Sequence, residues 1–113
     1  PVNPCSKPLP FAPVPRHQID KYPKMLTRLR ARYPKKAKQQ GIQATLRIEL
    51  DIRRNGCVRR VRIVSIAPKK AKGYGFAKVC IKAFRQVRFK PPLRKGKPVD
   101  VTLRFVHRFM LDD

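Results

Sequence analysis

The sequence predicts an α+β domain: a three-stranded antiparallel sheet with an amphipathic helix packed on one face and a short N-terminal helical segment. Two observations support this prediction. Apolar residues alternate with polar ones over 45–53, 58–65 and 99–109, which is the period of half-buried strands. Near 75–87 the apolar residues instead recur at helical spacing. The length of 113 residues fits one domain.

The first 19 residues differ from the rest of the chain. Residues 1–18 read PVNPCSKPLPFAPVPRHQ, and such dense proline removes amide donors and favours extended backbone. We therefore expect residues 1–19 to end a proline-rich linker and residues 20–113 to form the domain. The chain starts at Pro1 and has no apolar run of the roughly 20 residues that span a bilayer. We expect any membrane anchor to lie upstream.

Two helical segments are predicted before the sheet. Asp20 can cap a helix over 20–32 whose apolar residues are Tyr22, Met25, Leu26 and Leu29. Pro34 suits the first turn of a second, short helix that continues through Ala37 to Gln40. Gly41 is a favourable C-terminal stop.

The first two strands are predicted to form a hairpin. Asn55-Gly56 is the strongest short hairpin signal and separates two alternating segments. In the second strand Val58 lies out of phase with Val61, which predicts a β-bulge near the turn. The apolar face of the first strand consists of Leu46, Ile48, Leu50 and Ile52.

The second half of the chain supplies the packed helix and the third strand. The helical stripe consists of Phe76, Val79, Cys80, Ala83, Phe84 and Val87. Pro91-Pro92 ends this segment, and Lys95-Gly96-Lys97-Pro98 makes a turn. In the last strand the apolar residues are Val99, Val101, Leu103, Phe105 and Phe109, alternating with Asp100, Thr102, Arg104 and Arg108. His107 shares the apolar parity and is expected near the sheet edge.

The net charge of +23 results from 29 Lys and Arg against six acids, and it favours an anionic partner or surface. Two basic runs are candidate anion-binding sites, although such runs are usually solvated faces. Their candidate residues are Lys35, Lys36, Lys69, Lys70 and Lys72. Nucleic-acid binding is the competing class, but no RNP-like aromatic pair, KH-type Gly-x-x-Gly, zinc finger or basic zipper is present.

The chemistry-bearing residues do not predict an enzyme. Glu49 and Asp51 lie two apart on one strand face and offset neighbouring arginines more plausibly than they form an acid–base pair. We predict no catalytic residues, no cofactor and no metal site, because His17 and His107 are isolated and no CxxC exists. Cys80 is expected in the core, with a disulfide to one of the other two cysteines, Cys5 or Cys57, as the alternative.

The order of motifs resembles the TonB C-terminal domain family over about residues 33–109. The chain has Tyr33-Pro34, Ala37 and Gly41 before its first strand. The segment Gly56-Cys57-Val58-Arg59-Arg60-Val61-Arg62-Ile63 follows the turn. Ala83 in the helix, Phe89-Lys90-Pro91 and then Gly96-Lys97-Pro98-Val99 complete the pattern. Each motif is weak alone, and their ordered combination is fairly specific.

The resemblance implies a periplasmic energy-transducing domain tethered to the inner membrane by an upstream anchor. Such domains bind an extended plug segment of an outer-membrane TonB-dependent receptor by strand addition, and an inner-membrane motor complex drives them with the proton-motive force. By this resemblance the receptor-binding residues are Tyr33, Pro34, Val99, Asp100, Val101, Thr102, Leu103, Arg104 and Phe105.

Three alternatives to this function stay open at this point. The same domain could serve a secretion or surface-motility machine, or a basic protein could bind nucleic acid or another polyanion. The polar face of the last strand could also be plain solvated surface, with Arg104 and Arg108 protecting an unpaired edge. An anionic surface and a second copy of the chain are further candidate partners.

Overall fold

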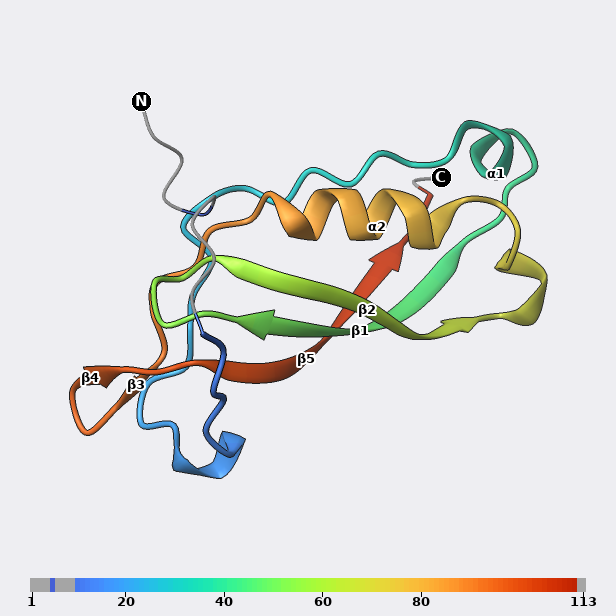
Figure 1. Ribbon diagram of the computed structural model, residues 1–113. Coiled ribbons are helices and arrows are strands. Elements are labelled where there is room, and N and C mark those ends of the chain that lie inside the picture. The colour runs from blue at the N-terminus through green and yellow to red at the C-terminus, as the bar shows by residue number, and fades with distance from the viewer. Residues whose placement is uncertain (1–4, 6–9, 112–113) are drawn as a thin grey trace.

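The computed structural model describes residue 5 and residues 10–111. A three-stranded antiparallel sheet has the order β2-β1-β5, with β1 at Ala44–Ile52, β2 at Val58–Ala67 and β5 at Val101–Phe109. Helix α2 (Phe76–Arg85) runs across one face of this sheet (Figure 1). The predicted fold class is confirmed.

The alternating sequence pattern explains the core. In β1 the even-numbered side chains from Leu46 to Ile52 are fully buried, as expected for a strand with one face against a helix. The stripe of α2 joins them in the core through Phe76, Cys80 and Phe84. Val87 lies beyond the end of the helix but is still buried.

The β1–β2 hairpin contains the predicted bulge. The pairing register shifts between Asp51 and Ile52, where Ile52 pairs with Val58. A second shift, between Arg47 and Ile48, was not predicted from the sequence.

The 3₁₀ turn η1 (Arg16–Gln18) lies against β5, and four other short elements lie at the ends of the sheet. Helix α1 (Lys35–Gln39) confirms the predicted short helix before Gly41, and the 3₁₀ turn η2 (Lys69–Ala71) follows β2. Strands β3 (Leu93–Arg94) and β4 (Lys97–Pro98) form a small hairpin at the predicted turn. Lys95 and Gly96 both have positive φ, as the tight two-residue turn requires.

The helix predicted over 20–32 is wrong: this segment is extended and forms a strap, defined here as residues 20–34, that runs alongside α2 (Figure 1). Its backbone pairs with the segment after α2, for example from Leu26 N to Arg88 O at 2.7 Å. Pro23 disfavours helical backbone at the residue before it. Asp20 is not a helix cap, because its Oδ2 accepts a hydrogen bond from Lys95 N.

The strap has its own alternation. Leu29, Ala31 and Tyr33 pack against the core, whereas Arg30 and Arg32 are exposed. This period of two was visible in the sequence beside the helical one. Because the strap is extended, Tyr22, Met25 and Leu26 are exposed instead of forming a buried stripe.

Candidate functional site: the outer edge of β5

Strand β5 is an edge of the sheet. Its partner is β1, in a register that runs from Ala44 opposite Phe109 to Ile52 opposite Val101. Its other side faces no named strand among residues 10–111. Such an edge offers backbone donors and acceptors to an added strand.

One hydrogen bond shows which backbone groups of β5 point outward. Val14 N donates to the carbonyl of Asp100 at 3.0 Å, so the backbone groups of residue 100 face away from β1. Consecutive residues of a strand direct their N–H and C=O groups to opposite sides. The outward groups of β5 therefore belong to Thr102, Arg104, Val106 and Arg108.

The N-terminal segment, defined here as residue 5 and residues 10–19, already covers the beginning of this edge. Pro13 forms a parallel bridge with Asp100, and Ala12 N donates to Asp100 Oδ2 at 2.9 Å. Val99 N donates to Pro92 O at 3.0 Å. Of the predicted edge residues, Val99 and Asp100 are thus engaged within the chain. From Thr102 onward the outer side of β5 pairs with no strand among residues 10–111, although the 3₁₀ turn η1 (Arg16–Gln18) lies against β5. We call this part of β5 the open edge.

The side chain of Asp100 anchors three parts of the fold. Alternation in the sequence placed it on the polar face with Thr102, yet it is 4% exposed. Its Oδ1 accepts a hydrogen bond from Arg54 N at 2.6 Å, and the Arg54 Nε lies 4.0 Å from the same oxygen. Burial is tolerated because a carboxylate that accepts several donors is compensated for lost hydration. Asp100 therefore joins the β1–β2 turn, the N-terminal segment and the start of β5.

A hollow of about 520 Å³ lies beside the open edge. Strand β5 contributes Leu103, Arg104 and Phe105, and the N-terminal part contributes Arg16, His17, Tyr22 and Pro23. Sequence reasoning missed the N-terminal contributors because it assigned them to a linker and a helix. The hollow can receive side chains of a strand that pairs with β5.

On the sheet face opposite α2, the polar side chains of β5 form a hydrogen-bonded network with those of β1. Thr102 Oγ1 donates to Asp51 Oδ1 at 2.8 Å, and Arg104 Nε donates to Glu49 Oε2 at 3.3 Å. The hydrogen bond from Arg62, with help from Arg104, lowers the pKa of Glu49. The network holds Arg104 over the sheet, although its side chain remains 64% exposed.

Tyr33 and Pro34 lie at the opposite end of β5 from Asp100. The Tyr33 hydroxyl donates to Ile42 O, and its ring meets Phe76 and Phe109 edge-on at centroid distances of 5.7 and 5.6 Å. Burial raises the pKa of Tyr33. These contacts dock the end of the strap beside the last residue of β5, and Pro34 leads into α1.

The predicted basic residues gather at this same end. Lys35 and Lys36 lie on α1, and Lys69, Lys70 and Lys72 lie on or next to η2; all five are exposed. The segments that follow these two elements are joined by the Tyr74 hydroxyl, which donates to Gln40 Oε1 at 2.6 Å. The structure thus brings both runs to the end of the sheet where β5 stops.

The cysteines have structural roles. Cys5 and Cys57 form a disulfide, which ties the N-terminal segment to the β1–β2 turn. Cys80 is a free, buried thiol, as the first of the two sequence expectations stated, and burial raises its pKa to about 12. Such a thiol is protonated at neutral pH and is a poor nucleophile.

The described part of the chain has neither a metal-binding cluster nor a membrane-spanning helix. Its residues include no cluster of three or more His, Cys, Asp and Glu side chains that could hold a metal ion. No helix within residues 10–111 is both long and apolar enough for a membrane span.

Comparisons with known proteins show the family and the fold of the chain. Residues 29–111 match the family described as Gram-negative bacterial TonB protein C-terminal. The chain therefore belongs to this family of energy-transducer domains. No curated protein matches the sequence closely enough to be called a relative.

A solved structure shows the same fold. The solution NMR structure of the Pseudomonas aeruginosa TonB CTD superposes with a TM-score of 0.66 at 21% identity. The match covers 83% of this chain and 91% of that chain.

Proposed function

We propose that this chain is the periplasmic, receptor-engaging domain of a TonB-type energy transducer. Its partner is an outer-membrane TonB-dependent receptor, whose extended plug segment adds as a strand to β5. An anchor upstream of this chain tethers the protein to the inner membrane and to the motor complex there. Family membership supports this proposal, and the single structural observation that carries it is the open edge of β5 from Thr102 onward.

Strand addition suits a pulling machine. Several backbone hydrogen bonds that are loaded together resist force better than one contact, and they demand little side-chain specificity. β5 is itself supported along its whole length by β1. A captured strand would therefore pull on a ladder and not on a single loop.

The N-terminal segment is well placed to carry load into the domain. It is attached at Cys57 through the disulfide and at Asp100 through backbone and side-chain hydrogen bonds. Force from a linker would reach the start of β5 by this route without stretching the strap. We propose that residues 1–19 are the end of this linker.

The exposed lysines at the other end of the sheet are proposed as an accessory contact with an anionic surface. Lys35, Lys36, Lys69, Lys70 and Lys72 have no role in strand pairing, and their charge would raise the local concentration of an acidic receptor face. The effect would weaken as salt screens the charges.

Proline substitution tests the open edge. Thr102→Pro and Arg104→Pro each remove an outward amide and leave the inward amides that pair with β1, so the fold should survive. We expect each to weaken binding of a receptor plug peptide by roughly tenfold, through the lost donor and the displaced neighbouring bonds. Isothermal titration calorimetry measures the affinity, and circular dichroism checks the fold.

The matched control for the edge is Thr102→Ala, which keeps the amide and should change peptide affinity less than about threefold. Peptide-induced NMR shifts confined to 69–72, with 102–108 unaffected, would refute strand capture and favour the lysines as the binding site. Concentration-dependent shifts on β5 without peptide would indicate pairing with a second copy of the chain.

A further inference from the structure

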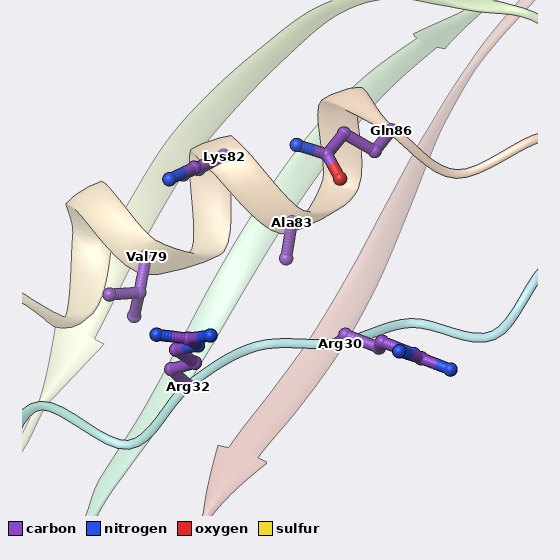
Figure 2. Close-up of a pocket in the computed structure, with 6 residues that line it drawn as sticks. All are labelled: Arg30, Arg32, Val79, Lys82, Ala83 and Gln86. Atoms are coloured by element: carbon purple, nitrogen blue, oxygen red, sulfur yellow. The ribbon is translucent and has the colours of Figure 1, made fainter.

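A second hollow lies between the strap and α2. Its lining includes no residue of β5 and none of the five lysines proposed as an accessory contact. It has a volume of about 370 Å³. Figure 2 shows Val79 and Ala83 pointing from α2 toward the strap, with Arg32 rising into the space between them. Lys82 and Gln86 from α2 and Arg30 from the strap complete the lining. We call this site the strap groove.

The strap groove is lined by donors and has no carboxylate. Four of the six acidic residues lie in the described part of the chain, and each is engaged elsewhere. Asp20 accepts from Lys95 N, Glu49 and Asp51 pair with arginines of the sheet, and Asp100 is bound at the β1–β2 turn. The positive charges of the strap groove are therefore left without a carboxylate from residues 10–111.

The fold sets the backbone of both walls of the strap groove and leaves their polar side chains exposed. On the strap, alternation directs Arg30 and Arg32 outward while Leu29, Ala31 and Tyr33 pack inward. On α2, Lys82 and Gln86 are four residues apart and share a helix face. Arg30, Arg32 and Lys82 bring three positive charges to the lining of this groove, and a bound anion would offset the repulsion between them.

We propose that the strap groove binds an anion that carries a phosphate group. The Arg32 guanidinium can donate a bidentate fork, Lys82 supplies a point charge, and the Gln86 amide adds a further donor. Donors that approach from two walls suit a tetrahedral oxyanion better than a planar carboxylate. The aliphatic floor of Val79 and Ala83 offers no aromatic platform for a base, so the phosphate itself is the recognised group.

Inorganic pyrophosphate is the probe for the phosphate chemistry, with citrate as a carboxylate anion of similar charge. The oxidised protein is titrated with each and followed by amide NMR shifts at residues 30–32 and 79–86. We expect pyrophosphate to bind the strap groove and citrate to bind it at least about fivefold more weakly. Equal affinity at these residues would overturn the phosphate assignment.

Charge-matched variants separate the strap groove from the general basicity. Arg32→Gln and Lys82→Gln should each weaken pyrophosphate binding by roughly tenfold. The controls are Arg28→Gln, which lies on the same strap but outside the groove, and Lys97→Gln on β4. All four side chains are exposed, so the fold is not at risk. If the groove variants and the control variants lose pyrophosphate affinity equally, the anion is bound by diffuse charge only, and the proposal is wrong.

The source of the phosphate is decided with vesicles. Binding to phosphatidylglycerol vesicles but not to phosphatidylcholine vesicles, lost in Arg32→Gln and kept in Arg28→Gln, would identify a lipid headgroup. Arg32-dependent pyrophosphate binding with Arg32-independent vesicle binding would identify a soluble phosphate compound. Arg32→Gln should leave capture of the plug peptide on β5 unchanged, so the two proposals can fail separately.

Discussion

Gly56 lies where the β1–β2 turn touches the segment after α2, and both its backbone and its surroundings exclude a side chain. Its φ is +85°, and an added Cβ would lie 1.9 Å from Phe89 O. Phe89 N also donates to Gly56 O at 2.8 Å. The glycine thus permits a backbone contact that closes one end of the core.

Gly56→Ala should lower the free energy of unfolding by more than about 2 kcal/mol, because left-handed strain and the clash with Phe89 add together. Chemical denaturation measures the loss. Gly41→Ala is the matched control, since Gly41 has positive φ but nothing within 4 Å of an added Cβ; it should lose only about 1 kcal/mol. Equal losses would show that the Phe89 contact does not matter.

The sequence signalled this residue only in part. Asn55-Gly56 predicted a hairpin turn from local chemistry, and the turn is present. The contact of Gly56 with Phe89 depends on the path of the chain after α2. The sequence around Gly56 does not predict that path. The same holds for Asp100, whose burial depends on the position of Ala12 and Arg54.

At the scale of elements, the three strands and α2 were predictable from their hydrophobic periods, whereas α1 was predictable from Pro34 before it and Gly41 after it. The strap was not, because its apolar residues fit two periods. Leu26 and Leu29 suit a helix, whereas Leu29, Ala31 and Tyr33 suit an extended chain. Backbone pairing with 88–93 selects the extended form, and tertiary contacts of this kind override local preference.

The edge position of β5 was predictable from the sequence, whereas the position of the N-terminal segment beside it was not. Family resemblance placed binding on 99–105, and β5 is an edge strand. The N-terminal segment, which occupies Asp100 and helps to line the hollow, has almost no hydrophobic pattern of its own. Its position is set by one disulfide, by a few hydrogen bonds from residues distant in sequence, and by packing of Val14 and Ile19 on the core.

The N-terminal segment gives a prediction at this scale. The Cys5–Cys57 bond closes a sequence separation of 52 residues, so Cys5→Ser should reduce stability by about 2–4 kcal/mol. Without the bond, the amides of Ala12 and Val14 should exchange with solvent faster, while amides between β1 and β5 stay protected. Hydrogen exchange by NMR measures both. Unchanged protection at Ala12 and Val14 would mean that the contacts of the segment with Asp100 and the core hold it without the disulfide.

At the scale of the whole molecule, two of the four carboxylates in the described part of the chain neutralise arginines of the sheet. Glu49 lies between Arg62 and Arg104, and Asp51 pairs with Arg59. These contacts lie on the sheet face opposite α2, which no helix covers in Figure 1. The chain as a whole still carries a net charge of +23, and self-repulsion at that charge opposes the compact state.

The stability of the fold should therefore fall in acid and recover with salt. Arg62 and Arg104 lower the pKa of Glu49 in the folded protein, so its stabilisation is fully present above its unfolded pKa. This stabilisation is lost as the pH falls through the lower folded pKa, because protonation removes the charge between two arginines. Glu49→Gln should lower the free energy of unfolding by roughly 0.5–1 kcal/mol at pH 7 and should make the loss of stability in acid less steep.

Salt near 0.5 M should raise the melting temperature of both wild type and Glu49→Gln by screening repulsion between cations. Thermal melts from pH 7 to 3 at low and high salt measure these effects. Parallel pH profiles for wild type and Glu49→Gln would show that this carboxylate does not hold the arginines of the sheet together.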